Sequence, residues 1–145
     1  MSEQAKTSRR PADIYFFATC VVDQFFPGAG LDAITLLERE GIRVHFPEEQ
    51  TCCGQPAYTS GFSDEARKVA ALQLTLFPND WPVVVPSGSC AGMMKHHYPT
   101  LFEADPVRKK LAESLSARVY ELTDFLVNVL DWQPEDKGSD CTVVL

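Results

Sequence analysis

The stretch Glu49-Gln50-Thr51-Cys52-Cys53-Gly54-Gln55-Pro56 sets two cysteines side by side and follows them with glycine and proline. Neighbouring side chains of an extended strand point to opposite faces, so both thiols can serve one site only if the backbone turns sharply. Gly54 permits a turn with positive φ, and Pro56 stiffens the chain that follows. We therefore interpret this stretch as a turn that carries a functional pair of thiols.

Apolar segments on both sides of this stretch alternate between strand and helix patterns. Short apolar runs predict strands at 14–18, 42–46, 83–85 and 118–122. Apolar residues at helical spacing predict helices at 31–40, 63–77, 90–97, 106–116 and 123–130. We expect Ser63 and Thr123 to cap their helices and Pro99 to stop the helix that follows Cys90. The alternation predicts an α/β fold with a mainly parallel sheet and helices on both faces.

Cysteines follow the first three predicted strands. Cys20 comes after the first, Cys52 and Cys53 after the second, and Cys90 after the third. The carboxyl ends of parallel strands share one edge of a sheet, which is where ligands of open α/β sheets bind. We therefore expect the four thiols to meet on loops at this edge, in one metal or cluster site.

Length and composition favour one soluble domain. The 145 residues are enough for a hydrophobic core without disulfides. We expect a disordered tail at 1–12, a cysteine-rich domain at 13–131, and a linker with the start of a further strand at 132–145. The net charge of −7 argues against a nucleic-acid partner, which would favour a basic face. No apolar run approaches the length of a membrane span.

The cysteine count bears on the compartment. Five cysteines, an odd number, in a chain without a secretory leader favour a reducing, cytoplasmic compartment. Ser8-Arg9-Arg10 ahead of the apolar run 14–22 superficially resembles a twin-arginine export signal. Pro11 and Asp13 interrupt that pattern and no small-residue cleavage site follows, so we expect no export.

Four converging thiols leave several chemistries open. Thiolates bind soft or borderline metals, and four of them suit zinc or an iron–sulfur cluster. The alternatives are cysteines that only fill buried space, a vicinal disulfide between Cys52 and Cys53, and thiol–disulfide chemistry at that pair. We expect Cys141, in the linker, to be unliganded. For His96 and His97, a surface or helix-end role is the simpler expectation.

Longer segments around the cysteines carry a family resemblance. Pro47-Glu48-Glu49-Gln50-Thr51-Cys52-Cys53-Gly54-Gln55-Pro56-Ala57-Tyr58 and Pro86-Ser87-Gly88-Ser89-Cys90-Ala91-Gly92-Met93, with Cys20 upstream, resemble the cysteine-rich CCG domain family. That family includes lactate utilization protein A, the cysteine-rich subunit of heterodisulfide reductase and the iron–sulfur subunit of glycolate oxidase. The resemblance runs from about residue 14 to residue 130. It implies a cytoplasmic iron–sulfur subunit that passes electrons during oxidation of L-lactate or a related 2-hydroxy acid such as glycolate.

The resemblance also implies roles for particular residues and partners. Cys20, Cys52, Cys53 and Cys90 would be cluster ligands, and glycines would let the backbone approach the cluster: Gly54, Gly88 and Gly92. Met93 stands where the fullest family motif has a further cysteine, and a thioether is a poor substitute for a thiolate. We therefore expect a [4Fe–4S] cluster rather than a five-cysteine cluster, with zinc in a structural or docking domain as the alternative.

The expected partners follow from the same resemblance. They are sister subunits of a lactate or glycolate oxidation complex, among them a flavoprotein. Relatives carry two copies of the motif and this chain carries one, so a homodimer is a further expectation.

Overall fold

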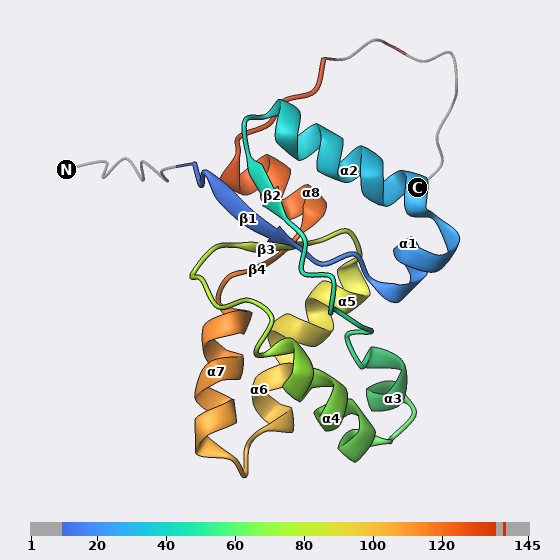
Figure 1. The fold of residues 1–145 in the computed structure, drawn as a ribbon, viewed down its shortest axis with the longest axis vertical. Helices are drawn as coiled ribbons and strands as arrows, with labels where there is room; N and C mark the ends of the chain where they lie inside the picture. The colour runs from blue at the N-terminus through green and yellow to red at the C-terminus, as the bar shows by residue number, and fades with distance from the viewer. Residues whose placement is uncertain (1–9, 136–137, 139–145) are drawn as a thin grey trace, which may run out of the picture.

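The computed structural model describes residues 10–135 and 138, which form a four-stranded sheet covered by helices (Figure 1). The strands are β1 (Asp13–Phe16), β2 (Arg43–His45), β3 (Val83–Val85) and β4 (Val119–Glu121). Their order across the sheet is β2-β1-β3-β4, and each neighbouring pair runs parallel. The predicted α/β class with a parallel sheet is confirmed.

Helices connect the parallel strands. β1 leads to β2 through α1 (Cys20–Phe25) and α2 (Pro27–Arg39), and β2 leads to β3 through α3 (Gln55–Thr59) and α4 (Ser63–Gln73). Between β3 and β4 lie α5 (Gly88–Gly92), the π-helical turn η1 (Met93–His97), α6 (Tyr98–Leu101) and α7 (Pro106–Ser116). After β4 come α8 (Leu122–Asp124) and a second π-helical turn, η2 (Phe125–Val129).

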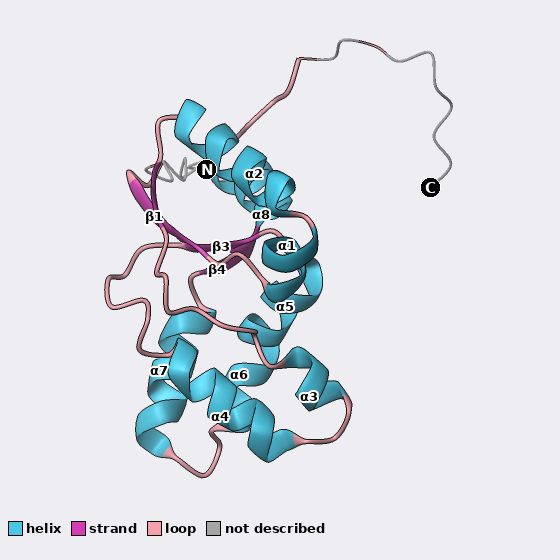
Figure 2. Cartoon of the chain, turned by 45° about the vertical axis from the view of Figure 1, so that its right-hand side comes forward, coloured by secondary structure: helices cyan, strands magenta, loops and turns pink. Residues whose placement is uncertain are grey.

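Alternating side chains of β1 divide the core into two layers. Ile14 and Phe16 are fully buried on the face that α2 and η2 cover. Tyr15 and the following Phe17 are buried on the opposite face, against α4, α6 and α7. Figure 2 shows the same arrangement, with α2 and α8 above the sheet and α4, α6 and α7 below it. Burial of these apolar side chains on both sides of the strand is what holds the layers together.

The helix that carries Cys90 is longer than predicted. Pro99 does not stop it, because the chain continues as helix from Gly88 to Leu101. Pro99 is the second residue of α6 and follows the wide turn η1, and a helical start tolerates a residue without an N–H group. The predicted stop was therefore wrong.

Two predicted caps were also wrong. Ser63 is the first residue of α4 rather than its cap, and no side chain caps that helix. At the last helix, Glu121 rather than Thr123 is the cap, and its carboxylate accepts hydrogen bonds from the N–H groups of Thr123 and Asp124. A carboxylate at a helix start also meets the positive end of the helix dipole.

Two short helices have no counterpart in the sequence pattern. Helices α1 and α3 lie in segments that were predicted as loops, and α2 begins at Pro27 rather than at residue 31. Neither α1 nor α3 buries a residue fully, so neither has the apolar periodicity on which a helix prediction depends.

The chain ends are only partly covered by the structure. Most of the predicted tail at 1–12, together with Cys141 and the predicted strand from residue 142, lies outside the described residues. Within the predicted linker, the N–H group of Trp132 donates a hydrogen bond to the carbonyl oxygen of Leu126, 2.9 Å away. No helix in the described part of the chain has the length and apolar character needed to span a membrane.

Candidate functional site

The four cysteines lie as two pairs that link three segments of the chain. The Cys20 thiol donates a hydrogen bond to Sγ of Cys52, 3.7 Å away, and the Cys53 thiol donates to Sγ of Cys90, 3.2 Å away. We call Cys20–Cys52 the outer pair and Cys53–Cys90 the inner pair. The charge of Cys90 also acts on Cys20, since it contributes to the raised pKa of that thiol. The structure thus joins the four thiols as two pairs, which the adjacent residues Cys52 and Cys53 connect, and their role as ligands remains a prediction.

Each cysteine follows a strand of the sheet, although not always in a loop. Cys20 is the first residue of α1, which begins soon after β1, and Cys90 lies in the first turn of α5 after β3. Cys52 and Cys53 occupy the loop between β2 and α3. Thr19 precedes Cys20 with a φ of 32°, and its hydroxyl accepts a hydrogen bond from the N–H group of Val22. A β-branched residue seldom adopts such a φ, so the turn into α1 is strained.

Gly54 makes the predicted sharp turn. Its φ is 85°, and its N–H group donates to Sγ of Cys52 at 3.4 Å. A Cβ atom at this position would lie 3.3 Å from the carbonyl oxygen of Ala66 in α4, so the turn is also closely packed. At Gly88 and Gly92, by contrast, a Cβ atom would meet no heavy atom within 4 Å.

The inner pair holds its protons unequally. The hydrogen bond from Cys53 lowers the pKa of the Cys90 thiol to about 6, and the hydroxyls of Ser87 and Ser89 add to this effect. The same bond, together with burial, raises the pKa of Cys53 far above its ordinary value. Burial also raises the pKa of Cys20 in the outer pair. At neutral pH the inner pair therefore shares one proton, with the thiolate at Cys90.

Side chains that the sequence analysis did not single out hold the double-cysteine loop in place. The side-chain amide of Gln50 donates a hydrogen bond to the carbonyl oxygen of Phe16, the last residue of β1, and accepts one from the N–H group of Ala18. Gln73 is fully buried and donates from Nε2 to Oγ1 of Thr51 at 2.7 Å. Tyr98, also fully buried, donates from its hydroxyl to the carbonyl oxygen of Cys53 at 2.9 Å. Burial raises the pKa of this tyrosine well above its ordinary value.

One of these residues had a sequence signal. Gln73 follows Ala66 and Ala70 on the buried face of α4, at helical spacing. A glutamine in phase with core residues needs a hydrogen-bonding partner inside the protein.

The outer pair opens on a pocket of about 370 Å³. Its lining includes Cys20 and Cys52, two acidic residues, Asp23 and Glu48, and the aromatic ring of Phe46. These two carboxylates are the only charged groups in the described lining. The inner pair is buried beneath, with Cys53 1% exposed. The site therefore has an accessible half and an enclosed half.

Among the described residues, the adjacent His96 and His97 form no hydrogen bond with the cysteines of the site. His97 stacks on Tyr58, with ring centroids 4.6 Å apart, and His96 is exposed.

The arrangement of the thiols bears on what they could hold. Within residues 10–135 and 138, no group of three or more Cys, His, Asp or Glu side chains is placed to hold a metal ion. Tetrahedral zinc would take four sulfurs at about 2.3 Å from one ion. A cluster takes one thiolate on each of several irons. Four cysteine sulfurs match either group in donor type and number.

Comparisons with known proteins identify the family of the chain. The family model "CCG: Cysteine-rich domain" matches residues 14–95, a span that contains all four cysteines. Lactate utilization protein A of Shouchella clausii is 46% identical over 129 residues, which are 89% of this chain and 53% of that protein. The protein of the same name from Geobacillus kaustophilus is 47% identical over 126 residues, 87% of this chain and 52% of that protein.

A further relative, lactate utilization protein A 2 of Bacillus cereus (strain 03BB102), is 44% identical over 123 residues, covering 83% of this chain and 51% of that protein. The chain thus spans about half the length of the curated relatives it matches. No solved structure matches the chain. Because a family model matches more than half of its length, the chain belongs to the CCG cysteine-rich domain family.

Proposed function

We propose that this domain holds an iron–sulfur cluster, of the [4Fe–4S] type, through Cys20, Cys52, Cys53 and Cys90. When bound, such a cluster supplies one-electron transfer. The observation that carries the proposal is the meeting of two thiol pairs, drawn from three strand ends, at one rim of the sheet. The relatives are named for lactate utilization. We propose that the electrons come from oxidation of L-lactate or a similar 2-hydroxy acid such as glycolate.

The charge of the pocket favours a domain that transfers electrons over one that binds the organic substrate. A 2-hydroxy acid is an anion at neutral pH, and its carboxylate would need a cation or several N–H donors. The pocket beside the outer pair instead carries Asp23 and Glu48. These carboxylates would repel lactate or glycolate. We therefore assign oxidation of the organic acid to a partner, a flavin-bearing sister subunit in the same cytoplasmic complex.

Open space near the cysteines supports a bound group. Gly88 and Gly92 flank Cys90, and the packing of the described residues does not require glycine at either position. We propose that the absence of a side chain there leaves room for the cluster. Gly54 has a different role, since its positive φ makes the turn that presents Cys52 and Cys53 to their separate partners.

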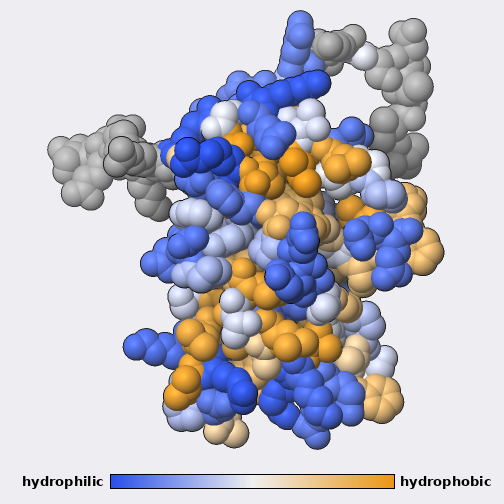
Figure 3. Space-filling view, in the orientation of Figure 1, coloured by the Kyte–Doolittle hydropathy of each residue, from blue (hydrophilic) through white to orange (hydrophobic). Residues whose placement is uncertain are grey.

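The proposed docking face for a partner surrounds the outer pair. Phe25 and Phe26 at the end of α1 are 70% and 62% exposed, and Phe46 at the rim of the pocket is 44% exposed. Apolar surface is visible around α1 and α2 in Figure 3. Exposed aromatic groups beside a redox centre suit contact with a sister subunit, or with a second copy of this chain.

Anaerobic reconstitution with iron and sulfide tests the proposal. The expected result is a broad visible absorption with about four irons and four sulfides per chain. Cys53→Ser and Cys90→Ser should each lose most of the bound iron, whereas Cys141→Ser should keep it as the matched control. Protein that binds no iron, or binds it equally well in all three variants, would overturn the proposal. Zinc alone in anaerobically purified protein would support the alternative, a structural or docking domain without a redox role.

A further inference from the structure

We propose that the metal-free domain is oxidised to two specific disulfides, Cys20–Cys52 and Cys53–Cys90, and that the outer one forms first. These pairings follow from the sulfur positions, 3.7 Å apart in the outer pair and 3.2 Å apart in the inner pair. A disulfide needs about 2.05 Å between its sulfurs, so a small side-chain movement closes each pair. The adjacent cysteines of the sequence do not pair with each other.

The turn at Gly54 explains why a vicinal disulfide does not compete. The N–H group of Gly54 bonds back to Sγ of Cys52, while the hydroxyl of Tyr98 holds the carbonyl oxygen of Cys53. These contacts fix the two thiols toward different segments, Cys52 toward α1 and Cys53 toward α5. A Cys52–Cys53 bond would break both existing sulfur contacts and close a strained ring.

Exposure sets the order of oxidation. Cys20 and Cys52 are half-buried and line the pocket of about 370 Å³, so their sulfurs can be reached from solvent without unfolding. Cys53 and Cys90 are 1% and 7% exposed. Thiol–disulfide exchange requires direct access to sulfur, so the inner pair must wait for a local opening of the fold.

The chemistry balances with glutathione disulfide as the oxidant. One thiolate of the outer pair attacks a glutathione sulfur, which gives a mixed disulfide and releases one glutathione thiolate. The second cysteine loses its proton and attacks the protein sulfur of that mixed disulfide, which releases the second glutathione. Two electrons and two protons leave the cysteine pair, and two glutathione thiols form. The inner pair follows the same steps with a second molecule of the oxidant.

Oxidation to the two disulfides would prevent the site from binding iron. With both disulfides formed, none of the four sulfurs is a thiolate, so none can bind iron. Loading would then require a dithiol reductant. This last consequence rests on the proposed cluster, whereas the pairing of the sulfurs does not.

Peptide mapping of metal-free protein tests the pairing. In a Cys141→Ser background, the protein is treated with glutathione disulfide, remaining thiols are alkylated, and trypsin is applied without reductant. Trypsin places Cys20, the double cysteine and Cys90 on three separate peptides. The expected product joins all three peptides through two disulfides. Samples taken early should show the Cys20 peptide already linked while the Cys90 peptide is still alkylated.

Single variants separate Cys52 from Cys53, which share a peptide. Cys52→Ser should link the double-cysteine peptide to that of Cys90 alone, and Cys53→Ser should link it to that of Cys20 alone. The reverse linkages, or an internal Cys52–Cys53 disulfide in the unmodified pair, would overturn the proposal. The parent protein by itself distinguishes a vicinal bond from two cross-links, so that outcome does not depend on the folding of either variant.

A separate measurement tests the proposed cluster independently of the disulfide pairing. Iron and sulfide binding is compared for oxidised protein before and after dithiothreitol. If the specific disulfides form but the reduced protein binds no iron, the proposed function is rejected and the pairing is kept. If the protein binds iron but its disulfides are scrambled, the proposed function is kept and the pairing is rejected.

Discussion

The side-chain Oε1 of Gln50 accepts a hydrogen bond from the backbone N–H group of Ala18 at 2.9 Å. Its Nε2 donates to the carbonyl oxygen of Phe16 at 3.2 Å, so one amide spans the end of β1. Gln50 and Ala18 each lie two residues before a cysteine of the outer pair. This contact therefore sets where Cys20 and Cys52 meet.

Removing the Gln50 amide should loosen the outer pair. We expect Gln50→Ala to lower the free energy of unfolding of the metal-free protein by about 2 kcal/mol, since two partly buried hydrogen bonds are lost. Urea unfolding of reduced protein measures the change. Gln24→Ala, at the exposed wall of the same pocket, is the control and should change stability little. Equal effects of the two variants would contradict the proposed contact.

Gly54 should tolerate alanine less well than another glycine with the same backbone. Gly54 and Gly61 both have a φ of 85°, so alanine at either costs about 1–2 kcal/mol in backbone strain. Only at Gly54 would the new Cβ also press on the carbonyl oxygen of Ala66, since the space at Gly61 is open. We expect the unfolding free energy to fall further in Gly54→Ala than in Gly61→Ala. A larger loss at Gly61 would show that close packing at Gly54 is unimportant.

The sequence was informative where its pattern reports burial. The apolar runs that became β1 and β3 are buried on both faces, and this is what placed the cysteines at successive strand ends. Gly54 was identified as a positive-φ turn because few other residues adopt that conformation.

The sequence did not predict features that depend on tertiary contacts. Which thiols pair with which depends on the path of the loop after β2 and on the contacts of Gln50 and Tyr98, and no local pattern encodes these. Helix α1 was missed because it depends on the Thr19 cap and not on an apolar face. Pro99 misled because a wide helical turn precedes it.

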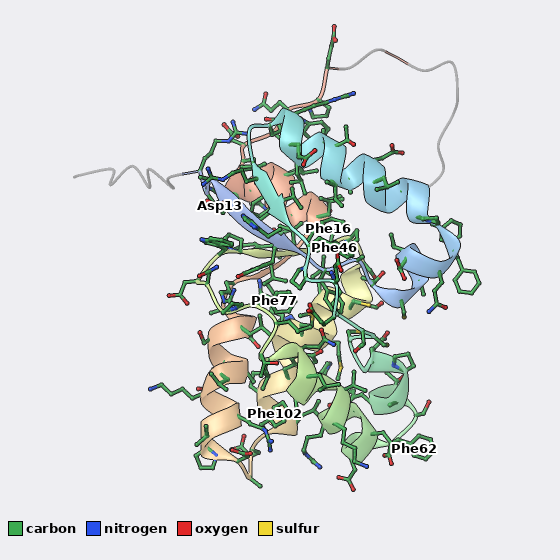
Figure 4. The ribbon with its side chains drawn as sticks, viewed as in Figure 1. Asp13, Phe16, Phe46, Phe62, Phe77 and Phe102 are labelled. Atoms are coloured by element: carbon green, nitrogen blue, oxygen red, sulfur yellow. The ribbon has the colours of Figure 1, made fainter. Side chains whose placement is uncertain are left out.

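The ion pairs of Asp13, at the amino end of β1 (Figure 4), should make stability depend on pH. Hydrogen bonds of 2.7–2.8 Å hold the pKa of Asp13 far below its usual range. The contribution of Arg43 is the largest, and that of His45 comes second. A carboxyl group with a lowered folded-state pKa stabilises the fold above its unfolded pKa of about 4, and this stabilisation is lost as the pH falls through the folded value. We therefore expect Asp13→Asn to be destabilised at pH 7 and to approach the parent protein in stability as the pH falls below 4.

Urea unfolding at pH 7, 5 and 3 measures this difference. Glu113→Gln, an exposed change on α7 that removes the same charge, serves as the control and should show little difference at any of the three pH values. A gap between Asp13→Asn and the parent that stays constant down to pH 3 would show that the carboxylate charge of Asp13 does not contribute.

The inner pair should titrate as a unit in reduced, metal-free protein. Because Cys53 donates to Cys90, the pKa of Cys90 falls to about 6, and thiolate absorption in the ultraviolet should rise with a midpoint near that pH. Cys90→Ser should remove this step. Cys53→Ala should move it to higher pH, because the thiol donor is gone while the hydroxyls of Ser87 and Ser89 remain. Cys141→Ser is the matched control and should leave the midpoint in place. A first thiolate that forms only above pH 8 in the parent protein would show that the Cys53–Cys90 hydrogen bond does not govern the charge of the site.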